Sequence, residues 1–158
     1  MRPIVTLTST ESPVLREKTK NVKNPLDPEI QALLPEMITI MRKAEGIGLA
    51  APQIGIPLRI CVTEVDGSVK YFINPKITSA SKEKIFYEEG CLSVPGKFLP
   101  IERSESITIR YVDEKGVERK ERPRDLQAIC LQHELDHLDG ILIVDRYKNQ
   151  KTTHAYAS

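Results

Sequence analysis

The stretch that most restricts the fold is LQHELDHLDG, residues 131–140, because it places two histidines four residues apart. On a helix such residues lie one turn above each other, so His133 and His137 can bind one metal ion. Glu134 lies about 100° around the helix from His133, where its carboxylate can handle a proton without binding the metal. The alternative is an amphipathic helix whose histidines share a face by coincidence. The chain has only three histidines, and two at this spacing favour a metal site.

Composition excludes several classes of protein. The 158 residues suit one domain, and 40% hydrophobic with 28% charged residues is typical of a globular chain. A formal net charge of +1 gives no broad attraction to nucleic acid or to an anionic membrane. No segment approaches the roughly 18 apolar residues that span a bilayer, and the N-terminus lacks the apolar core of a secretory signal. We therefore expect no direct nucleic-acid binding and no membrane partner.

The cysteines are few and odd in number: Cys61, Cys91 and Cys130. This argues against a disulfide framework and for a reducing compartment, where thiols remain available to bind a metal. Cys61 and Cys130 are expected to pack in the core.

The first predicted helix begins after Asp27, a good N-cap, with Pro28 at a position where its missing N–H costs nothing. The apolar residues that share one stripe of this helix are Ile30, Leu33, Leu34, Met37, Ile38 and Met41. Pro35 lies inside the pattern and is expected to kink or divide the helix. Gly46 and Gly48 are expected to end it.

The middle of the chain is strand-like, with runs at residues 59–64, 69–73, 106–112 and 117–121. Asp66-Gly67 between the first two runs is a hairpin signal. A second helix is predicted over about 124–138, with Gly140 placed to terminate it. The order helix, antiparallel strands, helix favours the α+β class over a parallel sheet.

The third metal ligand is not obvious downstream of the histidines. The candidates there, none of which lies in a recognisable metal-ligand pattern, are Asp139, Asp145 and His154. His154 is expected to be solvated. Upstream, residues 88–96 (EEGCLSVPG) hold Cys91, and a thiolate with two imidazoles would leave one position for water. Taken alone, Cys91 reads as a buried apolar thiol. Together with the two-histidine helix, it reads as the ligand.

A third stretch, GIGLAAPQIG at residues 46–55, combines glycines with Gln53, whose side-chain amide can donate a hydrogen bond. By itself, a Gly-Ile-Gly turn usually only terminates a helix. The stretch is not a phosphate loop, because no Lys-Ser/Thr follows and the glycines end a helix instead of opening one.

Taken together, GIGLAAPQ, EGCLS and QHELDHLDG resemble, in this order, the three signature motifs of the peptide deformylases. The resemblance covers at least residues 46–142. It implies an α+β fold with antiparallel sheets around a central metal-binding helix and an N-terminal helix. Residues 1–158 would form a single catalytic domain, with residues 147–158 as a short polar C-terminal tail.

The resemblance also implies roles for individual residues. The implied metal ligands are Cys91, His133 and His137. Glu134 would be the general base and acid, and Gln53 with the backbone N–H of Leu92 would bind the oxyanion. The positions implied to line or support the pocket for a methionine side chain are Gly48, Glu89, Gly90, Ile129 and Cys130.

The implied reaction removes the N-formyl group from the N-terminal formylmethionine of newly synthesised polypeptides and releases formate. Metal-bound hydroxide would attack the formyl carbon while Glu134 accepts and returns the proton. Ferrous iron is the implied native metal, with zinc, nickel or cobalt as substitutes. We expect a monomer in the cytoplasm of a bacterium or phage-infected host, or in an organellar stroma or matrix.

Two features depart from many bacterial relatives. Lys97 stands near the place of a basic residue that meets the substrate backbone, and the polar residues 147–158 replace a long basic helix associated with ribosome docking. Ribosome association is therefore left open.

Two rival functions remain. A zinc endopeptidase would need a downstream ligand and no EGCLS cysteine. A structural metal module would have four protein ligands, whereas three are found.

Overall fold

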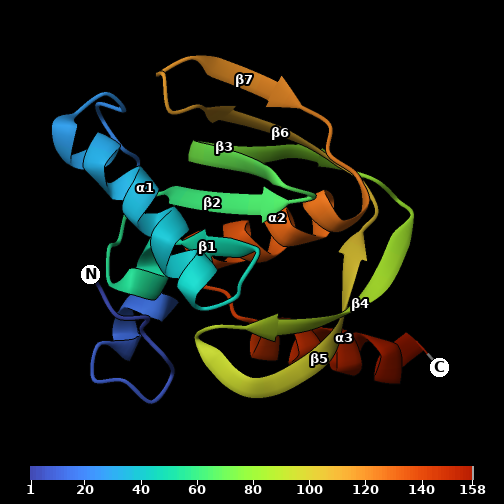
Figure 1. Ribbon diagram of the computed structural model, residues 1–158. Helices are drawn as coiled ribbons and strands as arrows, with labels where there is room; N and C mark the ends of the chain where they lie inside the picture. The colour runs from blue at the N-terminus through green and yellow to red at the C-terminus, as the bar shows by residue number, and fades with distance from the viewer. Residues whose placement is uncertain (158) are drawn as a thin grey trace.

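The computed structural model describes the backbone of residues 1–157 and the side chains of residues 1–150; Ser158 and the side chain of His154 lie outside it. The helical elements are η1 Ser12–Arg16, α1 Pro28–Lys43, η2 Ala51–Ile54, α2 Asp125–Leu138 and α3 Ile143–Ala157. The strands are β1 Gly48–Ala50, β2 Ile60–Val65, β3 Ser68–Ala80, β4 Lys84–Cys91, β5 Val94–Ser104, β6 Ile107–Val112 and β7 Glu118–Glu121. Five strands form an antiparallel sheet in the order β1-β2-β3-β6-β7, while β4 and β5 form a separate antiparallel pair (Figure 1). The predicted α+β class is confirmed.

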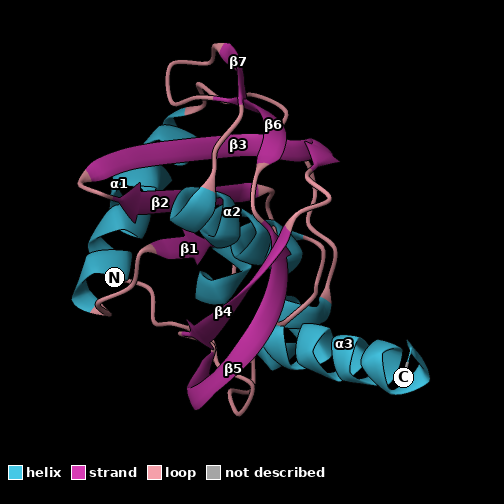
Figure 2. Cartoon of the chain, turned by 90° about the vertical axis from the view of Figure 1, so that its right-hand side faces the viewer, coloured by secondary structure: helices cyan, strands magenta, loops and turns pink. Residues whose placement is uncertain are grey.

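The five-stranded sheet is covered on both faces by helices. Along β2, Ile60 and Val62 belong to the apolar cluster that holds α1, whereas Cys61 between them belongs to the cluster that holds α2. Successive side chains of a strand point to opposite faces, so a run buried on both sides is apolar throughout. Helix α2 also contacts β5, and it therefore lies between the sheet and the β4–β5 pair (Figure 2).

The predicted hairpin at Asp66-Gly67 is confirmed. Val65 pairs with Ser68, and Asp66 and Gly67 between them have φ angles of 52° and 76°. Positive φ at both central residues is what a two-residue turn with the right twist requires. Strand β3 continues well past the predicted residue 73, because its second half pairs with β6.

Helix α1 begins as predicted, with the Asp27 carboxylate accepting a first-turn backbone N–H at 2.9 Å and Pro28 as the first helical residue. The helix continues through Pro35 without being divided there. It ends at Lys43, before the predicted glycines. Gly48 does not terminate the helix but opens β1, where it pairs with β2.

Helix α2 ends at Leu138 as predicted, and Gly140 follows its C-cap with a φ of 76°, which suits glycine. The N–H of Ile141 donates to the Asp136 carbonyl at 2.8 Å, and the N–H of Gly140 donates to the His137 carbonyl at 3.1 Å. A Cβ at Gly140 would lie 2.5 Å from the Arg16 carbonyl oxygen, so glycine also permits the close approach of the N-terminal segment.

The expectation of a short polar tail over residues 147–158 is wrong for the backbone that the structure describes. Helix α3 runs from Ile143 to Ala157. Ile143, Val144 and Tyr147 pack in the cluster that contains Ile101 of β5. The predicted tail began at Tyr147 and so left out the first two apolar residues that attach the helix. None of the helices described is long and apolar enough to span a membrane.

Candidate metal centre and active site

Cys91, His133 and His137 meet although the cysteine is more than forty residues away in the sequence. Cys91 ends β4, while both histidines lie on α2. The Cys91 Sγ atom lies 3.3 Å from Nε2 of His137, and the two Nε2 atoms lie 3.2 Å apart. All three donor atoms lie within 4.8 Å of one another. The structure therefore brings together the three residues predicted as ligands.

These separations fit a tetrahedral metal site. Metal–sulfur bonds of about 2.3 Å and metal–nitrogen bonds of about 2.0–2.1 Å put two nitrogens about 3.3 Å apart, and a sulfur and a nitrogen about 3.6 Å apart. The observed 3.2 and 3.3 Å differ from these values by only a few tenths of an ångström. A thiolate and two imidazoles can hold one divalent metal and leave a fourth position for a reactant.

Glu89 fixes the orientation of His133. Its Oε1 atom lies 2.8 Å from Nδ1 of His133, so the ring donates its Nδ1 proton to the carboxylate and turns Nε2 toward the other ligands. Arg103 donates two hydrogen bonds to the same carboxylate, at 2.8 and 2.9 Å. Burial raises the pKa of Glu89, but the hydrogen bonds from Arg103 and His133 outweigh it and lower the pKa below its usual value. Glu89 therefore remains an ionised support for the ring.

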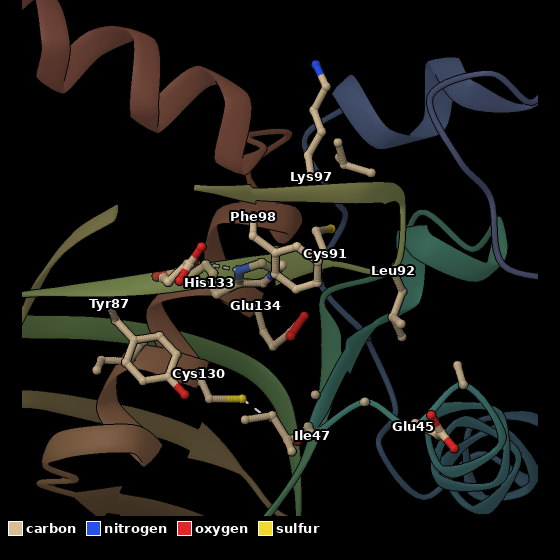
Figure 3. A pocket seen from close by; sticks show the side chains of 18 of the residues that line it. Glu45, Ile47, Tyr87, Cys91, Leu92, Lys97, Phe98, Cys130, His133 and Glu134 are labelled. Atoms are coloured by element: carbon tan, nitrogen blue, oxygen red, sulfur yellow. Dashed lines mark hydrogen bonds and ion pairs between the residues drawn. The ribbon is translucent and has the colours of Figure 1, made fainter. Parts of the chain in front are cut away.

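Glu134 is buried without a full set of partners. Glu134 is 3% exposed, and its Oε1 atom accepts no hydrogen bond from any residue that the structure describes. Burial raises the pKa of Glu134 to about 7. Figure 3 shows the Glu134 side chain in the same pocket as Cys91 and His133. A buried oxygen without a hydrogen bond lowers the stability of the folded protein, and it suits a group that binds a reactant.

Gln53 is held in one orientation by its neighbours. Its Oε1 atom accepts the backbone N–H of Ala50 at 2.9 Å. Its Nε2 donates to Ser93 Oγ at 3.3 Å and points toward Cys91 Sγ, 3.8 Å away. The amide N–H groups consequently face the ligand group. Leu92, which follows Cys91, lines the same cavity.

A cavity of about 590 Å³ adjoins the ligand group. All five residues predicted to line or support a methionine pocket lie on it: Gly48, Glu89, Gly90, Ile129 and Cys130. A Cβ at Gly48 would lie 2.6 Å from Oε2 of Glu134 and 2.8 Å from Sγ of Cys130. Glycine is therefore required at residue 48 to let the strand approach Glu134.

Several residues of the site escaped the sequence prediction. Tyr87 and Phe98 lie at the rim of the cavity and are 43% and 67% exposed. A Cβ on Gly90 would lie 2.7 Å from the Phe98 ring, which covers it. The pairing of Gly90 with Phe98 in β4 and β5 could have indicated this contact, but neither strand was predicted. In Figure 3 the Lys97 side chain points away from Glu134, and its substrate contact stays a prediction.

Comparison with known proteins decides the family. Residues 1–153 match the family model of polypeptide deformylase. A peptide deformylase from Pseudothermotoga lettingae is 49% identical over 133 residues, which are 84% of this chain and 77% of that protein. The chain belongs to the peptide deformylase family. A further peptide deformylase, from Rhizobium meliloti, is 43% identical over 150 residues, 92% of this chain and 84% of that protein.

Solved structures of the family share the fold. The peptide deformylase from Thermotoga maritima superposes with a TM-score of 0.87 at 39% identity, over 92% of this chain and 97% of that one. The peptide deformylase from Synechococcus elongatus in complex with actinonin also gives 0.87, at 38% identity, over 92% of this chain and 78% of that one. The predicted resemblance is therefore confirmed. Peptide deformylase membership, with Cys91 beside the histidine pair, argues against the endopeptidase alternative.

Proposed function

We propose that this chain removes the N-formyl group from the N-terminal formylmethionine of newly synthesised polypeptides and releases formate. The observation that carries the proposal is the convergence of one thiol and two imidazoles beside the buried carboxylate of Glu134, on the wall of a cavity. Membership of the peptide deformylase family supports the same reaction.

Cys91, His133 and His137 would hold one divalent cation, as their spacing allows. When bound, the cation supplies Lewis acidity, which polarises the formyl oxygen and lowers the pKa of a water molecule toward neutrality. The negative thiolate offsets one unit of its charge, so the centre is a milder acid than three histidines would make. The family resemblance supports ferrous iron as the native metal, with zinc, nickel or cobalt as substitutes.

Glu134 would move the proton. The pKa of about 7 that burial gives its carboxyl lies near neutrality, where a group can both accept and return a proton. A nearby cation favours the ionised form, so the residue starts as a base. It accepts a proton from the attacking water and passes it to the amine nitrogen as the C–N bond breaks. Formate and a free N-terminus result.

Gln53 and the backbone N–H of Leu92 would stabilise the negative charge that develops on the formyl oxygen. The hydrogen bond from Ala50 already fixes the Gln53 amide, so no reorientation is needed during the reaction. Each such donor is typically worth about 3–4 kcal/mol in the transition state.

The cavity would bind the methionine side chain. Ile129 and Cys130 offer an apolar wall, and burial raises the pKa of the Cys130 thiol, which keeps it neutral. Gly48 lets β1 approach Glu134 and Cys130 closely, and the Phe98 ring packs over Gly90. Glu89 supports the wall through His133. The formyl carbon bears only hydrogen, so a narrow site can admit it and exclude internal peptide bonds.

The decisive experiment measures formate release from a formyl-Met peptide, with the unformylated peptide as control. We expect one formate for each free amine formed and no cleavage of the control. Chelation of the metal should stop the reaction, and added divalent metal should restore it. Hydrolysis of unformylated casein without formate release would instead identify an endopeptidase.

The thiolate ligand predicts a difference between metals. Thiolate-bound ferrous iron is exposed to oxidation, whereas nickel is not readily oxidised under the same conditions. We expect iron-loaded protein to lose most of its activity in air while nickel-loaded protein keeps it. The measurement is residual formate release against time in air and under nitrogen. Equal aerobic decay of both forms would contradict the iron assignment.

We also propose that residues 1–158 act as a single catalytic domain and as a monomer, on nascent chains in the cytoplasm of a bacterium. The bacterial origin of the relatives supports this location.

A further inference from the structure

A chain of hydrogen-bonded charges runs from a metal-binding histidine to the C-terminal helix. It starts with the hydrogen bond from Nδ1 of His133 to the Glu89 carboxylate. It continues through Arg103, which donates to Glu89 from two nitrogens. The third nitrogen of Arg103, Nη1, donates to Oδ2 of Asp136 at 2.6 Å. Asp136 is in turn bound by Arg146 of α3, through Nε at 2.9 Å and Nη2 at 2.7 Å.

The positive and negative charges of this hydrogen-bonded series are equal in number only when Arg146 is counted. Glu89 and Arg103 each have 4% exposed side chains, and the Asp136 side chain is 11% exposed. Arg103 alone would stand between two carboxylates, leaving one negative charge uncompensated in a desolvated setting. Arg146 supplies the second positive charge from a side chain that is 45% exposed. A buried charge without its partner is strongly unfavourable.

Arg146 also constrains the orientation of the Asp136 carboxylate. Among the described residues, Oδ1 of Asp136 accepts a side-chain hydrogen bond from Arg146 alone. Asp136 directly precedes His137 on α2, so its carboxylate is covalently tied to the metal helix. Because a planar guanidinium binds both carboxylate oxygens, it fixes the rotation of that carboxylate. The position of Oδ2, to which Arg103 donates, is fixed with it.

We propose that Arg146 is a positioning residue for the metal centre, acting through Asp136 and Arg103 on Glu89 and His133. The inference rests on the proposed metal site. Helix α3 is thereby part of the device that orients the metal ligands, although it contributes no ligand itself. Partners that orient metal-binding histidines commonly change metal affinity or activity 10- to 100-fold when they are removed.

The test compares Arg146→Met with Arg146→Lys and with Arg16→Met. Arg16 makes the matched control, because it ion-pairs α3 through Asp145 with a similarly exposed side chain, 47% against 45%, and does not touch the network. Each variant is loaded with cobalt. Three quantities are measured: the rate of cobalt transfer to a chelator, the absorption spectrum of the thiolate–cobalt centre, and kcat and KM for formate release.

We expect Arg146→Met to lose cobalt roughly 10-fold faster or more, with a changed cobalt spectrum and a lower kcat at similar KM. Arg146→Lys should lie in between, because it keeps the charge but not the two-nitrogen contact. Arg16→Met should behave as the unchanged chain. Wild-type cobalt release and spectrum in Arg146→Met would overturn the proposal, as would equal losses in Arg16→Met.

Failure of the proposed function would look different. If the unchanged chain held cobalt but released no formate, the deformylase assignment would fail. The comparison of cobalt release and spectra would still decide the role of Arg146.

Discussion

Replacing Glu134 with glutamine is expected to lower kcat for formate release by about 10²- to 10⁴-fold, the usual contribution of a positioned proton carrier. Glutamine keeps the size of the side chain but cannot accept the proton of the attacking water. Cys91, His133 and His137 are untouched, so the variant should still bind one metal per chain. Steady-state formate release and metal analysis of the same preparation check both expectations.

Glu64→Gln is the control for this substitution. Glu64 forms an ion pair with Arg42 at the surface, and it is not among the residues that line the cavity. This change should leave kcat within the error of the assay. Turnover of Glu134→Gln close to the unchanged value would assign the proton transfer to another group.

Replacing Arg103 with methionine is expected to lower the free energy of unfolding by about 3–5 kcal/mol, because removal of one partner leaves buried charges uncompensated. Arg103 is 4% exposed and binds both Glu89 and Asp136. Its removal leaves the buried carboxylates of Glu89 and Asp136 without the cation that lies between them. Urea unfolding, with and without bound metal, measures the loss and separates weaker metal binding from weaker folding.

Arg119→Met provides the matched change at the surface. Arg119 pairs with Asp113 at 2.9 Å, but its side chain is 53% exposed. Ion pairs of this kind contribute about 0–1 kcal/mol. A loss of stability in Arg103→Met no larger than that in Arg119→Met would show that the buried network does not hold the fold together.

Local patterns explain why much of the fold was predictable. The N-cap at Asp27, the turn at Asp66-Gly67 and the stop at Gly140 each depend on a few adjacent residues. These are read directly from the chain, and all three are present in the structure. The elements that were missed have no such pattern. Strand β4 (KIFYEEGC) shows no alternation of apolar and polar residues, and its five exposed residues include Phe86 and Tyr87.

The C-terminal helix was missed for a different reason. Its attachment depends on Ile143, Val144 and Tyr147, only one of which falls in the segment predicted as a tail. A short apolar stripe at one end of a polar segment is a weak signal by itself. It becomes decisive only when β5 supplies the surface on which it packs.

The sequence by itself determined the chemistry available: two imidazoles one helical turn apart, a carboxylate beside them, and a thiol in a turn-prone segment. The histidine pair and the carboxylate follow from spacing along one segment, which helix geometry converts directly into distance. Only the tertiary structure decided that Cys91 reaches the histidines, that Glu89 and Arg103 stand behind His133, and that Arg146 closes the network from α3. Those contacts join segments that are separate in sequence, and burial of charge makes them interdependent, so no local pattern encodes them.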